Sequence, residues 1–313
     1  MNPGSKVRRR WVVRAGDGPL LRDVLARADV DAGAVRDGRV FVGRHRVVRD
    51  DEAVLEGDVV EVAGPQDGPG EARILADGGD VVAVEKPAGI PTIADHAGAA
   101  HALVTLAARA LGVEASHLHP TSRLDRDVSG VVVFARTKAA AERLRLARTE
   151  GTYARRYVAM TMNEPHPESG RWDAPIGRSA RTPRLRAVGG REAVPAATDY
   201  AVCGRAGRGA VLLAVSPRTG RTHQIRVHAS HAGSPLVGDH AYGGRVRLVL
   251  PNGRVHEPGR IALHALRISV PQATGEPLVV LAPIPDALRD LWSALGGAPD
   301  AWELAGSWDF ASP

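Results

Sequence analysis

The sequence predicts a protein of mixed helices and strands that is divided into two domains. A chain of 313 residues is long enough for about two domains of ~150 residues each. Short apolar runs rich in β-branched residues predict strands, and apolar residues spaced three and four apart predict helices. The stretch GPQDGPG at residues 64–70 is typical of a linker. We therefore expect one domain over residues 1–68 and a second over residues 69–313.

The composition is that of a soluble globular chain with a basic surface. Hydrophobic residues make up 44% of the chain and charged residues 24%, and the formal net charge is +6. Nearly all of the positive charge comes from arginine, which pairs well with phosphate. This balance favours a polyanionic partner. A mildly basic surface is also common among soluble proteins, and an arginine bias is also typical of some genomic base compositions.

Several classes of protein are not expected. Cys203 is the one cysteine, so neither a disulfide framework nor a cysteine-based zinc site is predicted. The first residues, MNPGSKVRRRW, lack the apolar segment of a signal peptide. No apolar run reaches about 18 residues, so we expect no membrane span. The expected location is the cytoplasm.

The first domain begins with a helical pattern. Apolar residues recur at helical spacing within residues 19–28, at Leu20, Leu21, Val24 and Leu25. Strand-like segments follow at residues 35–43 and 56–60. This order resembles the small S-four-type RNA-binding module, and the resemblance implies RNA-facing side chains at Arg36, Arg39, Arg44 and Arg46. The alternative is an ordinary α+β cap with a solvated basic face.

The second domain opens with alternating strand and helix patterns. Strands are predicted at residues 74–75, 81–84, 131–134 and 152–161. An Ala/Leu-rich segment predicts a helix over residues 101–111. Thr137 is typical of the N-cap of a further helix that runs to about Thr149, and Gly151 is typical of its end.

The C-terminal half contains the densest group of arginines. These are Arg178, Arg181, Arg184, Arg186 and Arg191, and we interpret the segment as a hairpin that contacts phosphates. A solvated loop is the alternative. Residues 286–295 have the apolar spacing of an amphipathic helix. Residues 296–313 carry no clear pattern, and we expect Trp302 and Trp308 to be packing residues.

Charged residues lie directly before the apolar run at 131–134. Asp125 lies between Arg123 and Arg126, at the start of a predicted buried strand. Nearby cations favour the ionised form of a carboxylate, so Asp125 is a candidate base or nucleophile. A structural ion pair at the strand end is an equally weighted alternative.

Two long motifs resemble those of one enzyme family. RLDRDVSG at residues 123–130, followed by an apolar strand, resembles the signature of the RluA-type pseudouridine synthases, which convert a uridine in RNA into its carbon-linked isomer. TGRTHQIRVH at residues 219–228 is similar to the other main element of that family, and GSPLVGD at 233–239 continues the match. Weaker resemblances are KPAGIP at 86–91, RYVA at 156–159 and a closing strand hairpin within 262–285. The resemblance covers most of residues 75–290, in the order of the family.

The resemblance implies roles for individual side chains. Asp125 would be the catalytic carboxylate, Tyr157 would stack on the uracil, and Arg226 would pair with Asp125. Contacts to the nucleotide are implied for Arg123, Arg126, Arg221, His223 and Ile225. Two positions depart from the family pattern, because Ser122 replaces the usual His and Val128 the usual Thr. Without the resemblance, Tyr157 would be interpreted as a half-buried strand residue.

The resemblance also implies a fold and a partner. The family fold is α+β, a mixed, largely antiparallel sheet with flanking helices and a central catalytic cleft; here a small α+β RNA-binding module would precede it. No cofactor is implied, in line with the lack of dinucleotide-binding and P-loop glycine motifs. The expected partner is ribosomal or transfer RNA, and we expect a monomer.

Two other classes of function stay open. The chain is alternatively a non-catalytic RNA-binding protein that retains the cleft, a hypothesis motivated by Ser122 and Val128. A metal hydrolase would bind its metal through His223, His228 and His231. Their spacing is not HExxH and no carboxylate ligand is close in sequence, so we expect no metal site.

Overall fold

The chain divides into two compact units. The computed structural model describes residues 9–31, 33–36, 40–43, 45–47, 49–62, 72–94, 99, 101–182 and 184–310. The first unit is Met1–Ala72 with Ile90–Ala115, and the second is Arg73–Gly89 with Ser116–Pro313. The predicted linker at 64–70, Arg39 and Arg44 lie outside the described residues, as do the side chains of Arg36 and Arg46. The predicted boundary at residue 68 stays a prediction.

The first unit contains a four-stranded antiparallel sheet in the order β1-β4-β2-β3. Its elements are β1 (Arg9–Val12), α1 (Leu21–Arg27), α2 (Gly33–Arg36), β2 (Val40–Val42), β3 (His45–Arg46), β4 (Val59–Val62) and α3 (Leu103–Leu111). Helix α1 buries its apolar face in a core with Val40 and Val60 of the sheet. The predicted helices at 19–28 and 101–111 are therefore confirmed.

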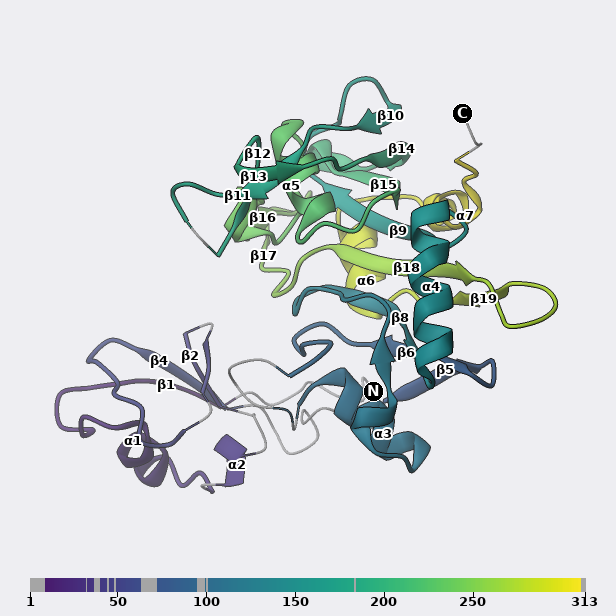
Figure 1. The fold of residues 1–313 in the computed structure, drawn as a ribbon. Coiled ribbons are helices and arrows are strands. Elements are labelled where there is room, and N and C mark those ends of the chain that lie inside the picture. Colours follow the sequence, from purple (N-terminus) through teal and green to yellow (C-terminus); the bar gives the residue numbers. More distant parts are fainter. Residues whose placement is uncertain are drawn as a thin grey trace. The chain divides into compact units, whose positions relative to one another are not determined.

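The second unit is built on a ten-stranded sheet (Figure 1). The strand order is β10-β14-β15-β9-β18-β8-β6-β5, with β19 beside β18 and β7 beside β8. Neighbouring strands are antiparallel except for β8 and β18, which pair in parallel. The predicted mixed, largely antiparallel sheet is confirmed. The strands are β5 (Arg73–Asp77), β6 (Val81–Lys86), β7 (His119–Pro120), β8 (Ser129–Ala135), β9 (Ala154–Thr161), β10 (Ser169–Trp172), β14 (Thr198–Arg205), β15 (Val211–Pro217), β18 (Leu263–Val270) and β19 (Leu278–Leu281).

Two smaller sheets complete the strands of this unit. One has the order β12-β11-β13 and the other pairs β16 with β17. Their bounds are β11 (Ile176–Arg178), β12 (Arg186–Val188), β13 (Arg191–Val194), β16 (Leu248–Val249) and β17 (Val255–His256). The arginine-rich segment thus forms a small three-stranded sheet rather than a simple hairpin.

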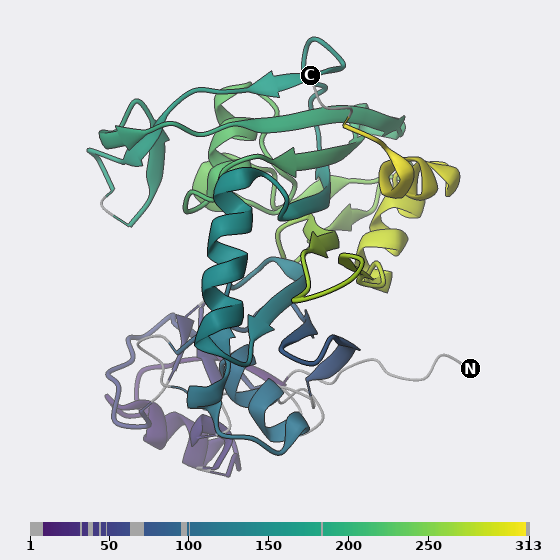
Figure 2. The same ribbon diagram turned by 45° about the vertical axis from the view of Figure 1, so that its right-hand side comes forward.

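Helices cover the large sheet and lead into its loops. Helix α4 (Lys138–Glu150) packs Ala140, Leu144 and Ala147 against apolar residues of β6, β8 and β18, and it crosses the strands in Figures 1 and 2. Helices α6 (Asp286–Ala294) and α7 (Asp300–Ser307) share a core with β9 and β15. No segment pattern predicted α7, which is held by Trp302 packing edge-on against Trp292. Trp302 and Trp308 are packing residues, as expected.

Strand β8 is the most deeply buried strand, and it fixes the loop that precedes it. All seven of its residues are buried, which confirms the strand predicted at 131–134. Gly130 has φ 126°, and a Cβ there would lie 2.6 Å from the Ala265 Cα of the parallel strand β18. Only glycine allows this close approach. The charged segment that contains Asp125 therefore enters the core at a rigid point.

In the part of the chain that the structure describes, no helix is both long and apolar enough to cross a membrane.

Removing the N-cap of α4 tests why this helix begins where it does. The Thr137 hydroxyl accepts a hydrogen bond from the Ala140 backbone N–H at 3.1 Å, and Gly151 ends the helix with φ 81°. We expect Thr137→Ala to lower the free energy of unfolding by about 1 kcal/mol, measured by urea denaturation. Thr137→Ser keeps the acceptor and should match the wild type. Equal stability of the alanine and serine variants would contradict the capping role.

Candidate active site

Arg226 in helix α5 (Gln224–His231) joins two carboxylates from different segments. Its Nε and Nη2 donate to Asp239 Oδ2 at 2.7 Å and Oδ1 at 2.8 Å. Its Nη1 donates to Asp125 Oδ2 at 2.7 Å. One edge of the planar guanidinium is thus fixed by Asp239, and an N–H of Nη1 fixes the direction of the Asp125 carboxylate.

Two of the three charged groups in this cluster are removed from water, and Asp125 is 25% exposed. Arg226 is 7% exposed and Asp239 is fully buried. Burial by itself lowers the pKa of Arg226, but Asp239 and then Asp125 outweigh burial and raise that pKa above its ordinary value. A buried guanidinium needs such compensation, because an unpaired buried charge is costly.

His223 is the N-cap residue of α5 and lies beside Asp125 and Arg226. Its Nε2 is 3.8 Å from Asp125 Oδ2, and its Nδ1 is 2.7 Å from the Tyr242 hydroxyl. Burial lowers the pKa of His223, Arg226 adds to the decrease, and Asp125 opposes it. This shift favours the neutral form of the ring. His223 also has φ 58°, an uncommon left-handed conformation.

The buried ammonium group of Lys86 hydrogen-bonds to the loop that carries Asp125. The side chain is fully buried, and Nζ donates to the carbonyls of Pro87 at 3.0 Å, Arg126 at 2.9 Å and Val128 at 2.7 Å. Burial lowers the pKa of Lys86 to about 7, although Asp127 and Asp125 oppose this shift. The KPAGIP loop is thus joined to the loop that presents Asp125.

A second buried contact holds the end of the same loop. The Ser129 hydroxyl accepts a hydrogen bond from Arg260 Nη2 at 2.5 Å and lies 2.7 Å from His264 Nδ1. Ser129 and His264 belong to β8 and β18, the two parallel strands. The C-terminal half of the loop is therefore anchored to the sheet by two sets of buried contacts.

Tyr157 lies on β9, close to the strand that follows the Asp125 loop. Its side chain is 7% exposed, and burial raises the pKa of its hydroxyl. Its partner on one side in the sheet is Ala265 of β18, the strand that lies beside β8. The structure therefore joins Asp125 directly to Arg226, places Tyr157 two strands away from β8, and buries Ile225 in the first turn of α5.

The other residues implied by the family resemblance lie around this centre. Arg123 is exposed and Arg126 is half-buried. Arg221 is exposed, and its Nε donates to the Pro195 carbonyl at 2.9 Å. The Ser122 hydroxyl accepts a hydrogen bond from Tyr153 at 3.3 Å.

Val128, the second departure from the family pattern, is buried. Its backbone N–H donates to the Asp125 carbonyl at 3.1 Å, which closes a turn. The two departures are thus accommodated within the loop, one by a hydroxyl pair and one by burial.

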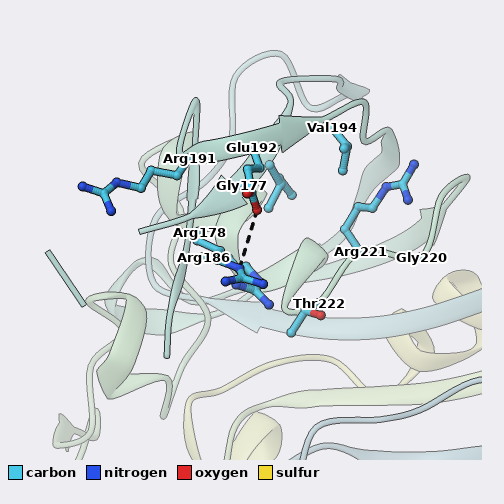
Figure 3. Close-up of a pocket in the computed structure, with 10 residues that line it drawn as sticks. Gly177, Arg178, Arg186, Arg191, Glu192, Val194, Gly220, Arg221 and Thr222 are labelled. Atoms are coloured by element: carbon cyan, nitrogen blue, oxygen red, sulfur yellow. Dashed lines mark ion pairs between the residues drawn. The ribbon is translucent and has the colours of Figure 1, made fainter. Parts of the chain in front are cut away.

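A pocket of about 290 Å³ lies between the three-stranded sheet and the 220–222 loop (Figure 3). Arginines from both sides line it, namely Arg178, Arg186, Arg191 and Arg221. Glu192 is the carboxylate in its lining, 3.9 Å from Arg178 Nε. One lining residue of the pocket is linked to the charge cluster, because the Arg186 backbone N–H donates to the hydroxyl of Tyr242, which also contacts His223.

Three residues at the centre were not assigned roles from the sequence. Asp239 lies in GSPLVGD and Lys86 lies in KPAGIP. Both segments resemble the family, but the resemblance was not used to assign a role to either side chain. Nothing in the sequence pointed to Tyr242, whose ring lies 4.8 Å from the Arg226 Cζ.

One histidine of the metal hypothesis, His228, has both ring nitrogens engaged by the protein. His228 Nδ1 lies 2.9 Å from Thr198 Oγ1, and Nε2 lies 2.9 Å from the Ala174 carbonyl. His228 therefore has no free ring nitrogen. Among the described residues, no group of three or more His, Cys, Asp or Glu is arranged to hold a metal.

Comparison with known proteins identifies the family. Residues 80–231 match the family model described as RNA pseudouridylate synthase. An RNA pseudouridine synthase of Bacillus subtilis is 34% identical over 71% of this chain and 72% of its own length. The chain belongs to the RluA-type RNA pseudouridine synthases. It is therefore an isomerase that converts uridine to pseudouridine in RNA.

Other pseudouridine synthases give the same result. Ribosomal large subunit pseudouridine synthase D of Xanthomonas campestris is 36% identical over 74% of this chain and 71% of that protein. A mitochondrial pseudouridylate synthase of Xenopus tropicalis is 30% identical over 84% of this chain and 93% of that protein. The solved structure of human RNA pseudouridylate synthase domain containing 4 shares the fold, with a TM-score of 0.59 at 23% identity over 72% of this chain and 93% of that one.

The Asp239 carboxylate should stabilise the folded protein as well as fix the orientation of the Arg226 side chain. Asp239→Asn leaves the buried Arg226 with one charged partner, so we expect the free energy of unfolding to fall by about 2–3 kcal/mol in urea denaturation. The control is Asp77→Asn, which breaks the exposed pair with Arg136 and should cost under about 1 kcal/mol. A similar decrease in the free energy of unfolding in the two variants would contradict a larger contribution from the buried pair.

Proposed function

We propose that Asp125 is the catalytic carboxylate of this pseudouridine synthase. In this proposal Arg226 aims Asp125, and Tyr157 is the aromatic surface for a uracil turned out of the RNA stack. The observation that carries the proposal is the 2.7 Å hydrogen bond from Arg226 Nη1 to Asp125 Oδ2. It comes from a guanidinium whose other edge is already held by Asp239, so the carboxylate is preorganised.

The isomerisation needs a group that acts at the sugar–base junction. The N1–C1′ bond breaks, the uracil rotates, and a C5–C1′ bond forms. The hydrogen on C5 leaves to solvent, and N1 regains a proton, so the reaction is balanced without an oxidant or a nucleotide. Asp125 would act on the nucleotide, while the buried face of Tyr157 would hold the base between the two bond changes.

We propose that the substrate is ribosomal RNA. The relative from Xanthomonas campestris is named for the large ribosomal subunit. The arginines around the pocket of Figure 3 offer contacts to phosphate rather than to base edges, which suits a structured RNA. Transfer RNA is the other candidate, and measuring isomerisation on the two purified RNAs separates them.

We further propose that the first unit is an S-four-type RNA-binding module and that the enzyme is a cytoplasmic monomer. A small helix packed on a four-stranded antiparallel sheet is compatible with such a module. Arg36, Arg39, Arg44 and Arg46 stay the proposed RNA-facing residues.

Tritium release from RNA labelled at uridine C5 measures the reaction directly. We expect wild-type enzyme to release tritium from ribosomal RNA, and Asp125→Asn to reduce the rate by at least about a thousandfold, since the amide is neither a base nor a nucleophile. RNA binding by the variant should stay near that of the wild type.

The matched control is Asp127→Asn, which alters an exposed carboxylate of the same loop. This variant should retain most of the activity. Release by Asp125→Asn at the wild-type rate would mean that another carboxylate is catalytic. Binding without release by the wild type on both RNAs would favour a non-catalytic RNA-binding protein.

A further inference from the structure

Two arginines beside the candidate active site converge on Gly220 of the TGRT loop. A Cβ placed on Gly220 would lie 2.2 Å from Arg148 Nη2 and 3.5 Å from Arg155 Nη1. The guanidiniums of α4 and β9 therefore lie close together, and the absence of a side chain at Gly220 leaves room for them. Arg221, the next residue of the loop, adds a third positive charge: burial and Arg155 lower the pKa of Arg148, and Arg221 adds to the decrease.

These arginines donate hydrogen bonds to backbone carbonyls. Arg148 Nη1 donates to the Thr121 carbonyl at 2.5 Å, and Arg155 Nη2 donates to the Thr219 carbonyl at 2.7 Å. Within the described part of the chain, no ion pair joins Arg148, Arg155 or Arg221 to a carboxylate. Arg155 Nε is buried without a hydrogen-bond partner. Like charges held together in this way favour an anion between them.

A groove of about 440 Å³ continues from Arg148 along helix α4. Its charged lining residues are Lys138, Glu142, Arg145 and Arg148, and His119 lies beside them. Lys138 and Arg148 are ten residues apart, which is about 15 Å along a helix. The groove is therefore longer than a site for a single small anion, and its charge is mainly positive.

The single carboxylate of this groove is engaged by one of its arginines. Glu142 Oε1 and Oε2 accept hydrogen bonds from Arg145 Nη2 at 2.6 Å and Nε at 2.8 Å. Both side chains are more than half exposed. An exposed pair of this kind contributes little to stability, so a phosphate can compete for Arg145.

We propose that the cluster of Arg148, Arg155 and Arg221 binds a phosphate of the RNA substrate. The adjoining nucleotides of the RNA would then lie in the α4 groove. The sequence gave no role to Lys138, Arg145 or Arg148. The inference rests on the proposed function in taking RNA as the ligand. It extends that function by adding a second phosphate-contacting surface, on α4, to the arginines of the three-stranded sheet.

Two substitutions in the groove should change RNA affinity in opposite directions. Arg145→Ala removes a cation and should weaken binding of a fluorescein-labelled 20-nucleotide oligouridylate severalfold. It should also lower the slope of log K against log salt by about 0.7, the value for one lost contact on a single strand. Glu142→Gln frees Arg145 and should tighten binding and steepen that slope. Fluorescence anisotropy of the full chain at several salt concentrations measures both.

The matched control is Arg289→Ala, an exposed arginine of α6 outside the groove, which should bind like the wild type. All three substitutions are at exposed positions, and melting curves verify folding. Wild-type affinity and salt slope in both groove variants would overturn the proposal, as would a shift of both in the same direction. Because the assay needs no turnover, its outcome is independent of tritium release, which tests Asp125.

Discussion

The candidate active site depends on one guanidinium shared between two carboxylates. Arg226 uses the Nε and Nη2 edge for Asp239 and Nη1 for Asp125, and the cluster is largely buried. Burying these charges is costly unless every hydrogen-bonding group is paired. Asp239 meets this requirement on one side, and Asp125, which stays 25% exposed, is paired to Arg226 on the other.

The surrounding fold makes that geometry rigid. The Asp125 loop is fixed by Lys86 at its carbonyls and by Arg260 and His264 at Ser129. These contacts tie the loop to strands in the middle of the large sheet rather than to mobile surface segments. The strained backbone of His223, at the start of the helix that carries Arg226, follows the same logic, since strain persists where neighbouring contacts determine the conformation.

Local patterns in the sequence predicted the elements that local physics determines. The apolar run of β8 and the Thr137 and Gly151 caps of α4 were all correctly interpreted. Helix α7 was missed because its stability comes from packing of Trp302 on Trp292 rather than from its own pattern.

The centre itself was predicted in part. The two long motifs led to Asp125 and Arg226, which lie 101 residues apart and are hydrogen-bonded in the structure. Asp239 and Tyr242 had no assigned role. They lie in a segment without helical or strand periodicity, so the sequence pattern could not predict their contacts with Arg226 and His223. No binding role was predicted for the α4 arginines, because a basic helix face is normally only exposed to solvent.

The most direct test of this account is the turnover of Arg226→Lys in the tritium-release assay. A lysine keeps the positive charge but has no planar fork to bridge Asp239 and Asp125. The account predicts that kcat falls at least about a hundredfold while RNA binding changes little, because the charge is present but Asp125 is no longer aimed. A folded Arg226→Lys enzyme with wild-type kcat would contradict the claim that this shared guanidinium positions the catalytic carboxylate.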